Sequence, residues 1–190
     1  IPCSTSLAIY ADPGNISASF NNGIKRSTMS ESISADDFRK ASGLWATGVS
    51  IVTTADKTGK PYGLTMNSVT SLSLDPPLYI VNLDKGSDTM KVLEDGGAFC
   101  INVLASDQQE LSNRFAKKGD NKFDGVNVNS GFAGAPCLEG ALMSIQCSVE
   151  SMHEGGDHII VVGRVEKIEQ LDPEQNAPLL YYRGRYAEIK

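Results

Sequence analysis

Alternating polar and apolar residues between Gly63 and Pro77 place the strongest constraint on how this chain can fold. Read in steps of two, one face of an extended strand carries Thr65, Asn67, Ser71, Ser73 and Asp75, and the other carries Leu64, Met66, Leu72 and Leu74. The alternation is irregular over residues 68–70, where we expect a β-bulge. Pro76-Pro77 ends the strand, and the apolar run 78–83 predicts a second one. One face of this unit is therefore dense in uncharged hydrogen-bonding groups.

A short helix over Asp88–Glu94 is predicted directly after the second strand. Ser87 stands where an N-cap residue is expected. A helix N-terminus attracts phosphate because its free amides and its dipole favour an anion. The strand face and the helix start together suit a flat polar cofactor with a phosphate tail. A solvated strand face followed by an ordinary capped helix explains the same pattern, so the residues alone leave both interpretations open.

Composition argues against several classes of protein. The 190 residues are enough for one domain with a substantial core. A net charge of −6, without any run rich in lysine or arginine, argues against a nucleic-acid binder. No apolar run approaches the ~18 residues of a membrane helix. Four cysteines without CxxC spacing and only two histidines argue against a metal site, and such cysteine usage indicates a reduced, cytoplasmic protein.

The rest of the chain predicts a mainly β domain. Residues 1–33, rich in Ser, Asn and Gly, are expected to form an N-terminal extension, and the domain occupies residues 34–190. Within the domain we expect helices over 34–46 and 107–118, strands over 49–54, 98–104, 141–152 and 158–170, a long loop over 119–140, a linker over 173–178 and one short strand within 179–189. Many strands at hairpin spacing favour a β-barrel over alternating βαβ units.

Signatures of common enzyme classes are missing from the sequence. There is no GxGxxG after a predicted strand, no P-loop and no GxSxG elbow. The two histidines, His153 and His158, straddle a predicted tight turn, so the sequence offers few candidates for the histidine of a Ser-His-Asp triad. The chemistry of this chain is therefore not expected to depend on a side-chain nucleophile.

Four segments occur in an informative order along the chain. They are Asp37-Phe38-Arg39 leading to Thr47-Gly48-Val49, then Gly63 through Asn67-Ser68 to Ser71-Leu72-Ser73-Leu74-Asp75-Pro76-Pro77, then Phe99 to Leu104, and finally Gly156-Asp157-His158 followed by Val162-Gly163. In this order they resemble the flavin reductase-like family, the small reductase components of two-component flavin-dependent monooxygenases. The resemblance covers about residues 35–189, and the serine-rich strand with the Gly-Asp-His turn is its most specific part.

The resemblance implies an FMN-binding split β-barrel with a few flanking α-helices, assembled as a homodimer. It also implies an NAD(P)H-dependent flavin reductase, in which NADH or NADPH reduces FMN or FAD and the reduced flavin passes to a partner monooxygenase. Such cofactors carry the bond-making themselves, which accounts for the lack of a nucleophile. Two alternatives stay open. One is a flavoprotein reductase that keeps its flavin bound and reduces another acceptor, such as ferric iron or a quinone, and the other is a non-catalytic flavin-binding protein.

Family positions carried onto this chain give the expected site residues. The flavin ring and ribityl chain would contact Thr65, Asn67 and Ser68, with Ser71 and Ser73 as further candidates, and the phosphate would be held by Lys85, Ser87 and Thr89. The resemblance adds Thr47, Met66, Leu74, Asp75, Pro76, Asn102, Asp157 and Tyr186 as cofactor-binding positions. His158, in the turn near the nicotinamide site, is the expected catalytic residue. Simpler interpretations are a structural turn histidine for His158, an ordinary N-cap for Ser87 and a solvated lysine for Lys85.

Overall fold

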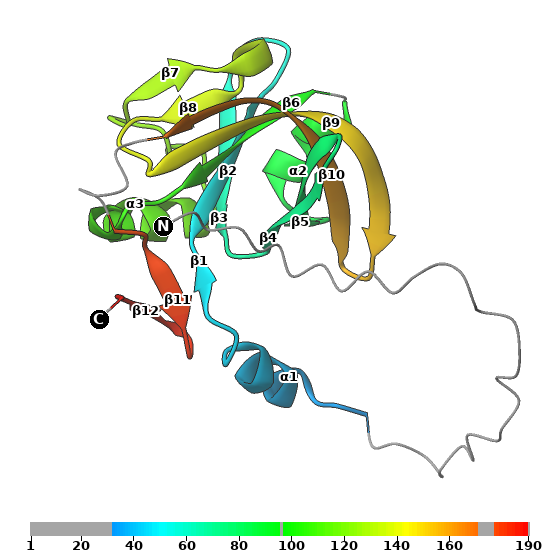
Figure 1. Cartoon of the computed structure of the whole chain (residues 1–190), viewed down its shortest axis with the longest axis vertical. Helices are drawn as coiled ribbons and strands as arrows, with labels where there is room; N and C mark the ends of the chain where they lie inside the picture. The colour runs from blue at the N-terminus through cyan, green and yellow to red at the C-terminus, as the bar shows by residue number, and fades with distance from the viewer. Residues whose placement is uncertain (1–31, 96, 171–176, 190) are drawn as a thin grey trace, which may run out of the picture. The chain divides into compact units, whose positions relative to one another are not determined.

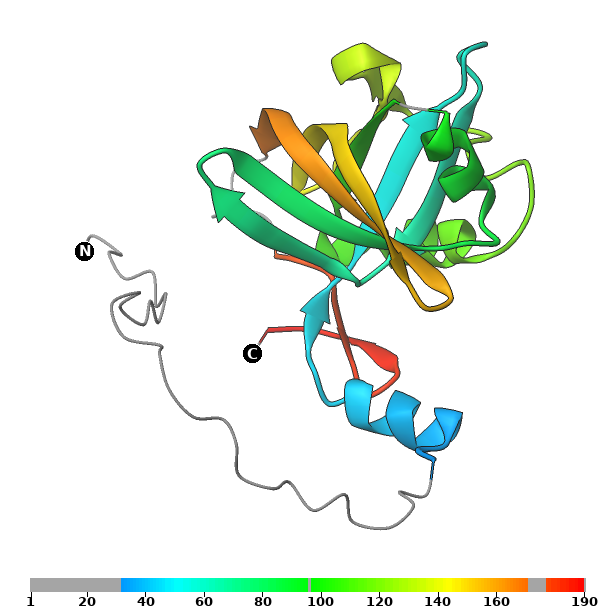
Figure 2. The ribbon, with the colours of Figure 1, turned by 90° about the vertical axis from the view of Figure 1, so that its right-hand side faces the viewer.

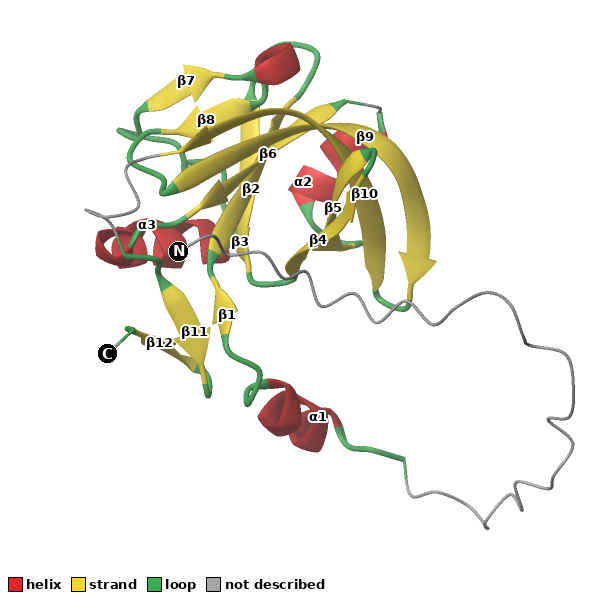
Figure 3. Cartoon of the chain, viewed as in Figure 1, coloured by secondary structure: helices red, strands yellow, loops and turns green. Residues whose placement is uncertain are grey.

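The computed structural model describes residues 32–95, 97–170 and 177–189, so the predictions for residues 1–33 and for the linker 173–178 lie almost entirely outside the described residues. The helices are α1 (Ala35–Ser42), α2 (Asp88–Glu94) and α3 (Gln109–Ala116), with 3₁₀ turns η1 (Ser106–Gln108) and η2 (Phe132–Gly134). The strands are β1 (Thr47–Gly48), β2 (Ser50–Ala55), β3 (Pro61–Met66), β4 (Val69–Leu74), β5 (Pro77–Asp84), β6 (Ala98–Val103), β7 (Val128–Ser130), β8 (Pro136–Leu138), β9 (Met143–Gly155), β10 (His158–Gln170), β11 (Leu180–Tyr182) and β12 (Arg185–Ala187). Strands dominate the described structure (Figures 1 and 3).

Seven strands form one antiparallel sheet in the order β3-β2-β6-β9-β10-β5-β4. A flat sheet of seven strands would separate its edges by about 29 Å, because neighbouring strands lie about 4.8 Å apart. Yet only two residues lie between the last residue of edge strand β3, Met66, and the first of edge strand β4, Val69. Three residue steps span at most about 11 Å. The sheet must therefore curl until its edges approach one another, and this curl makes the split barrel (Figure 2).

The single long strand predicted over residues 63–75 is wrong, because the chain changes edge at Asn67-Ser68. The expected bulge also lies later, since the register of β4 against β5 shifts between Ser71 and Ser73. The predicted apolar face is correspondingly split. Met66 is buried in the core, whereas Leu74 is 90% exposed. Burial does not alternate cleanly in either strand, so the sequence pattern does not describe one continuous apolar face.

The main core lies inside the curled sheet. Val52, Val81, Phe99 and Ile145 pack there with Met90 and Leu93 of α2. Gly163 of β10 lies against this core, because a Cβ atom added to it would overlap the ring of Phe99 and come within 2.9 Å of the Cβ atom of Cys147. The motif glycine at position 163 is therefore explained by close packing.

Local predictions outside the barrel agree with the structure in part. The prediction of one unstructured loop over 119–140 is wrong, because β7 and β8 pair within it. The single strand expected near the C-terminus is a hairpin of β11 and β12, turned by Arg183 and Gly184 at positive φ, and β1 pairs with β11. The helix predicted over 34–46 ends at Ser42, and α1 buries none of its residues. None of the described helices has the length and apolar character needed to cross a membrane.

Candidate functional site

A groove of about 450 Å³ lies where β3, the start of α2 and the segment after α3 meet. Its lining comes from three stretches, Lys60–Thr65, Asp84 with Gly86–Thr89, and Phe115–Asp120 with Lys122 and Phe123. Thr65, Ser87 and Thr89 are the predicted site residues that the groove brings together. The remaining predicted residues lie outside its lining.

The start of α2 has the geometry expected from the sequence. Ser87 is the N-cap, and its hydroxyl accepts a hydrogen bond from the Met90 amide at 3.1 Å. The Gly86 amide donates to Asp84 Oδ1 at 2.7 Å, which tightens the turn before the helix. Thr89 is buried at the base of the groove. The helix predicted over Asp88–Glu94 has the same bounds in the structure.

Thr65 is held by a hydrogen-bond network that reaches the C-terminal hairpin. Its hydroxyl donates to the Ser112 carbonyl of α3 at 2.6 Å. The Ser112 hydroxyl lies 2.9 Å from the Tyr186 hydroxyl, which also donates to Asn113 Oδ1 at 2.9 Å. Tyr186 and Arg185 line a second groove of about 370 Å³. Helix α3 therefore couples the predicted flavin residue Thr65 to the predicted flavin residue Tyr186.

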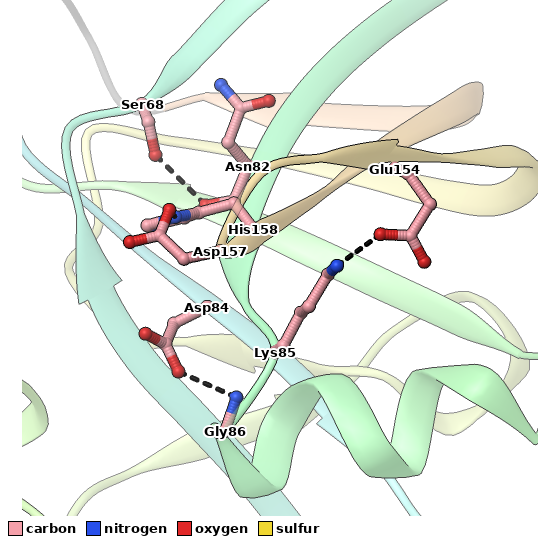
Figure 4. A network of polar contacts seen from close by, with 8 residues as sticks. All are labelled: Ser68, Asn82, Asp84, Lys85, Gly86, Glu154, Asp157 and His158. Atoms are coloured by element: carbon pink, nitrogen blue, oxygen red, sulfur yellow. Dashed lines mark hydrogen bonds and ion pairs between the residues drawn. The ribbon is translucent and has the colours of Figure 1, made fainter.

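Lys85, Asp157 and His158 gather around the tip of the β9–β10 hairpin, next to the end of β5 (Figure 4). The Lys85 ammonium pairs with the carboxylate of Glu154, and the Lys85 amide donates to the Asp157 carbonyl at 3.1 Å. His158 Nδ1 donates to Asp157 Oδ1 at 2.7 Å, since a carboxylate only accepts. This hydrogen bond and the imidazole's charge hold the pKa of Asp157 below its usual value. Asp157 thereby fixes the ring orientation of His158.

Ser68 lies near this hairpin tip. The Ser68 hydroxyl donates to the Asn82 carbonyl of β5 at 3.1 Å (Figure 4). Two residues later in β5, Asp84 is the register partner of His158. Asn67 is exposed in the connection between β3 and β4, and Ser71 and Ser73 lie along β4. Two groups of predicted residues thus come together, Thr65, Ser87 and Thr89 at the groove and Ser68, Lys85, Asp157 and His158 at the hairpin tip, whereas Ser71 and Ser73 belong to neither.

Asn102 is the clearest correction to the predicted site. Its side chain is fully buried, and its amide nitrogen donates to the Ile51 carbonyl and to Thr53 Oγ1, both at 3.0 Å. Its amide oxygen accepts from the Leu138 amide at 2.8 Å. These hydrogen bonds tie β6 to β2 and β8, and the buried Asn102 side chain lines neither groove.

Four other predicted positions also lie apart from the groove. The Met66 side chain packs in the core, so only its backbone remains for a ligand. Leu74, Asp75 and Pro76 lie at the exposed turn between β4 and β5.

Thr47 of β1 lies outside both grooves as well, but its hydroxyl is unusual. Among the described residues, Thr47 Oγ1 is the one buried side-chain polar atom without a hydrogen-bond partner. Buried polar groups are nearly always hydrogen-bonded, so a partner from outside this part of the chain is expected.

Sequence reasoning missed the contribution of α3 and of the segment after it. Ser112 reaches both Thr65 and Tyr186, and Lys122 donates to the Gly63 and Phe115 carbonyls, each at 3.1 Å. The available signal was weak: a group of lysines at 117, 118 and 122 in an acidic chain.

Comparison with known proteins gives a consistent result. Residues 42–190 match the model of the flavin reductase like domain. The reductase subunit HsaB of a flavin-dependent monooxygenase from Rhodococcus jostii is 41% identical over 160 residues, which are 84% of this chain and 80% of that protein. A nitrilotriacetate monooxygenase component B from Mycobacterium thermoresistibile has a crystal structure that superposes with a TM-score of 0.78 at 39% identity, covering 82% of this chain and 86% of that one.

A second solved structure is a complex with nucleotide fragments. The NADH:FAD oxidoreductase SgcE6 of Streptomyces globisporus, in complex with NAD and FAD fragments, superposes with a TM-score of 0.76 at 31% identity, over 82% of this chain and 92% of that one. The predicted split barrel is confirmed by these neighbours. On the match to its family model and the identity to its relatives, this chain belongs to the flavin reductase-like family.

Proposed function

We propose that this protein is an NAD(P)H:flavin oxidoreductase that reduces FMN or FAD and supplies the reduced flavin to a separate monooxygenase. The observation that carries the proposal is the groove that joins Thr65 of β3 to Ser87 and Thr89 at the start of α2. It offers neutral hydrogen-bonding groups along one side and helix amides at one end. The relatives named as reductase subunits of flavin-dependent monooxygenases support the same conclusion.

The residues present fit a flavin mononucleotide unit. The Thr65 and Ser68 hydroxyls use their protons on main-chain carbonyls, which leaves their lone pairs to accept from ring or ribityl hydrogens. Lys85 and the N-terminus of α2 supply positive charge for the phosphate. A bound flavin would accept hydride directly from a nicotinamide, so the protein needs only to hold the two rings together and exclude competing reactions.

His158 is proposed to orient the nicotinamide nucleotide. Because Nδ1–H donates its hydrogen bond to Asp157, the Nε2 atom is the one left for a ligand. We expect His158→Ala to raise the KM for NADH or to lower turnover, while flavin affinity stays within about twofold. An unchanged steady-state profile would return His158 to a structural role in the turn.

A homodimer is proposed because this chain leaves large apolar side chains in solvent. Phe38 and Trp45 are 65% and 78% exposed, and Leu74 lies on edge strand β4. Burying a large apolar side chain contributes about 1.5–3 kcal/mol, so covering this set is enough to matter for association. We expect sedimentation equilibrium to find a dimer that Leu74→Glu weakens and that Val128→Glu, at an exposed apolar residue of β7, does not. A wild-type monomer at micromolar concentration would contradict the proposal.

A cytoplasmic location belongs to the same proposal. Cys100, Cys137 and Cys147 are free thiols, which persist in a reducing compartment. Reduced nicotinamide nucleotides are also available there.

The deciding experiment measures NADH and NADPH oxidation under anaerobic conditions as FMN, FAD or riboflavin is added. The proposal expects a rate that saturates with added flavin, and it expects gel filtration to remove most of the flavin from the protein. Neutral hydrogen bonds of about 1 kcal/mol each favour such moderate affinity. Flavin that stays bound in a 1:1 ratio, with a rate indifferent to added flavin, would favour a tightly bound cofactor. Flavin binding without any oxidation would indicate a non-catalytic binding protein.

A further inference from the structure

Three cysteines lie in the described parts of the chain, and all three are buried free thiols. Two of them meet, because the Cys137 Sγ atom lies 3.6 Å from the Cys100 Sγ atom. Around this contact, Ala98 and Ala135 complete a small apolar cluster. A disulfide bond is about 2.05 Å long, so the two sulfurs are in van der Waals contact and about 1.5 Å short of a bond. Cys147 belongs to the main core instead.

The contact lies between the barrel sheet and the β7–β8 ribbon. The neighbours of Cys100 in β6 belong to the main core, so alternation directs the Cys100 side chain to the opposite face of the sheet. Strand β8 covers that face. The Leu138 amide donates to Asn102 Oδ1 at 2.8 Å, and the Thr53 hydroxyl donates to the Pro136 carbonyl. These two hydrogen bonds lie on either side of residue 137, and they hold its thiol against Cys100.

The two thiols differ in acidity and in exposure. The hydrogen bond with Cys100 lowers the pKa of Cys137, and the charge of Lys167 adds to this against burial and Glu169. The same contact, together with burial, raises the pKa of Cys100. Cys137 is 3% exposed, whereas Cys100 is fully buried. Because the thiolate is the reactive form of cysteine, Cys137 is the thiol that reacts first, and Cys100 is the one placed to resolve the product.

The cover over Cys137 is a single turn of chain. The backbone of Gly131 lies directly above the thiol, because a Cβ atom added there would come within 2.5 Å of Cys137 Sγ. The turn η2 that follows is exposed, and its Ala133 has a φ of 48°, a left-handed conformation that favours glycine. Opening of this turn would admit a small uncharged molecule to Cys137 while the barrel stays folded.

We propose that Cys100 and Cys137 form a modification site, a dithiol that hydrogen peroxide converts reversibly to a disulfide. The Cys137 thiolate attacks one peroxide oxygen, the O–O bond breaks, and hydroxide leaves a sulfenic acid on Cys137. The Cys100 sulfur then attacks the Cys137 sulfur, the S–OH bond breaks, and the Cys100 proton leaves with this hydroxide as water. In total, two thiols lose two electrons and two protons, and one peroxide becomes two waters. A thiol reductant reverses the change by exchange.

The proposed function supplies the oxidant. Reduced flavin that is released and not captured by a monooxygenase passes two electrons and two protons to oxygen, which gives oxidised flavin and hydrogen peroxide. This source of peroxide rests on the proposed function, whereas the dithiol itself does not. The disulfide would close a loop of 37 residues and tie β8 covalently to β6. Such a link constrains the unfolded chain and so stabilises the barrel while peroxide is present.

The test uses the full chain with Cys3→Ser, so that only the three described thiols remain. One arm adds hydrogen peroxide to the reduced protein. The other arm generates peroxide by NADH oxidation with added flavin in air, with and without catalase. Intact mass, a non-reducing peptide map and the Tm are measured before and after dithiothreitol. Cys100→Ala and Cys137→Ala are the test variants, because alanines already share this cluster, and Cys147→Ala is the matched control at a buried thiol outside it.

We expect a loss of about two hydrogens, one cross-linked peptide joining residues 100 and 137, and a Tm raised by about 5–15 °C, all reversed by dithiothreitol. Both test variants should abolish the link, and Cys147→Ala should keep it. A link to Cys147, oxidation of Cys137 without a link, or no reaction under conditions that oxidise the urea-unfolded chain would overturn the site. If turnover produces peroxide and no link forms, the enzyme is not the source. If NADH is not oxidised, the proposed function fails, and the arm with added peroxide still decides the site.

Discussion

Replacing Glu154 by Gln should make this protein bind FMN more tightly, although Glu154 has no proposed contact with the flavin. The Lys85 ammonium is paired with Glu154 in the flavin-free structure, and the two side chains are 41% and 77% exposed (Figure 4). An exposed ion pair contributes about 0–1 kcal/mol, whereas a charge-assisted hydrogen bond contributes about 1.5–3 kcal/mol. If Lys85 binds the flavin phosphate, it must first leave Glu154, and the weaker contact is the one that breaks.

The two variants of this pair should therefore act in opposite directions. Glu154→Gln releases Lys85 and should strengthen FMN binding up to about fivefold, since at most ~1 kcal/mol is no longer spent on separating the pair. Lys85→Ala should weaken FMN binding about 10-fold or more. The backbone position of residue 85 should be kept in both variants, because the hydrogen bond from its amide N–H to the Asp157 carbonyl does not involve the side chain.

Fluorescence titration with FMN and with riboflavin measures the effect, and riboflavin, which lacks phosphate, should respond to neither change. Glu150→Gln is the control, because Glu150 lies on the same hairpin but pairs with Arg164 at 2.9 Å. In the double variant, Glu154→Gln should have no effect on FMN binding once Lys85 is absent. Weaker FMN binding by Glu154→Gln, or equal shifts for FMN and riboflavin, would refute the assignment of Lys85 to the phosphate.

Three further predictions concern the stability of the barrel. Thr47→Val should raise the free energy of unfolding of the flavin-free protein, measured in urea, by about 1 kcal/mol, because a buried hydroxyl without a hydrogen-bond partner is costly. A loss of stability would show that the Thr47 hydroxyl has a hydrogen-bond partner. Gly163→Ala should lower that free energy by about 1–3 kcal/mol, because the new methyl group overlaps Phe99. Adding Phe99→Leu should restore part of the lost stability. An unchanged free energy of unfolding in Gly163→Ala would contradict this packing. Burial raises the pKa of Cys147 to about 12, so the unfolded chain loses its thiol proton first as pH rises above 9. Stability is then fully present below pH 9, and about 1.4 kcal/mol should be lost by pH 10 relative to Cys147→Ala, whereas parallel pH profiles would refute the shift.

The parts of this structure that the sequence predicts well are those decided by neighbouring residues. The bounds of α2 follow from Ser87 as N-cap and from the acidic first turn, and both signals lie within a few residues of the helix start. The hairpin of β9 and β10 follows from two β-rich runs around Gly156, which adopts a positive φ of 71°. These elements need no information from the rest of the chain.

The site depended on pairings that local pattern does not contain. One bulged strand and two edge strands joined by two residues show the same alternation of polar and apolar residues in the sequence. Only the order of strands in the sheet shows that β3 and β4 are two different edge strands. The partner of Thr65 is Ser112, 47 residues later, and neither residue carries a sign of the other. The resemblance places Asn102 among the cofactor-binding positions. The Asn102 side-chain amide instead forms hydrogen bonds with atoms of β2 and with the Leu138 backbone amide. The direction in which this side chain points is not contained in the local sequence pattern.

The exposed apolar residues show a different limit of pattern reading. The helix predicted over 34–46 would place Phe38, Leu44 and Trp45 on one apolar face, but α1 ends at Ser42, and in the described chain all three side chains are exposed. Apolar periodicity predicts that one face of an element will be buried, but it does not indicate whether the covering surface belongs to the same chain or to a partner. Leu72 and Leu74 repeat the case on β4, an edge strand with a bulge between Ser71 and Ser73, where both leucine side chains are exposed. Two elements that are amphipathic in sequence and unburied in the monomer are better explained by association than by misprediction, because large exposed apolar side chains in such number favour an interface. The same pattern that failed to describe the monomer core is therefore the strongest support that this chain offers for its proposed dimer.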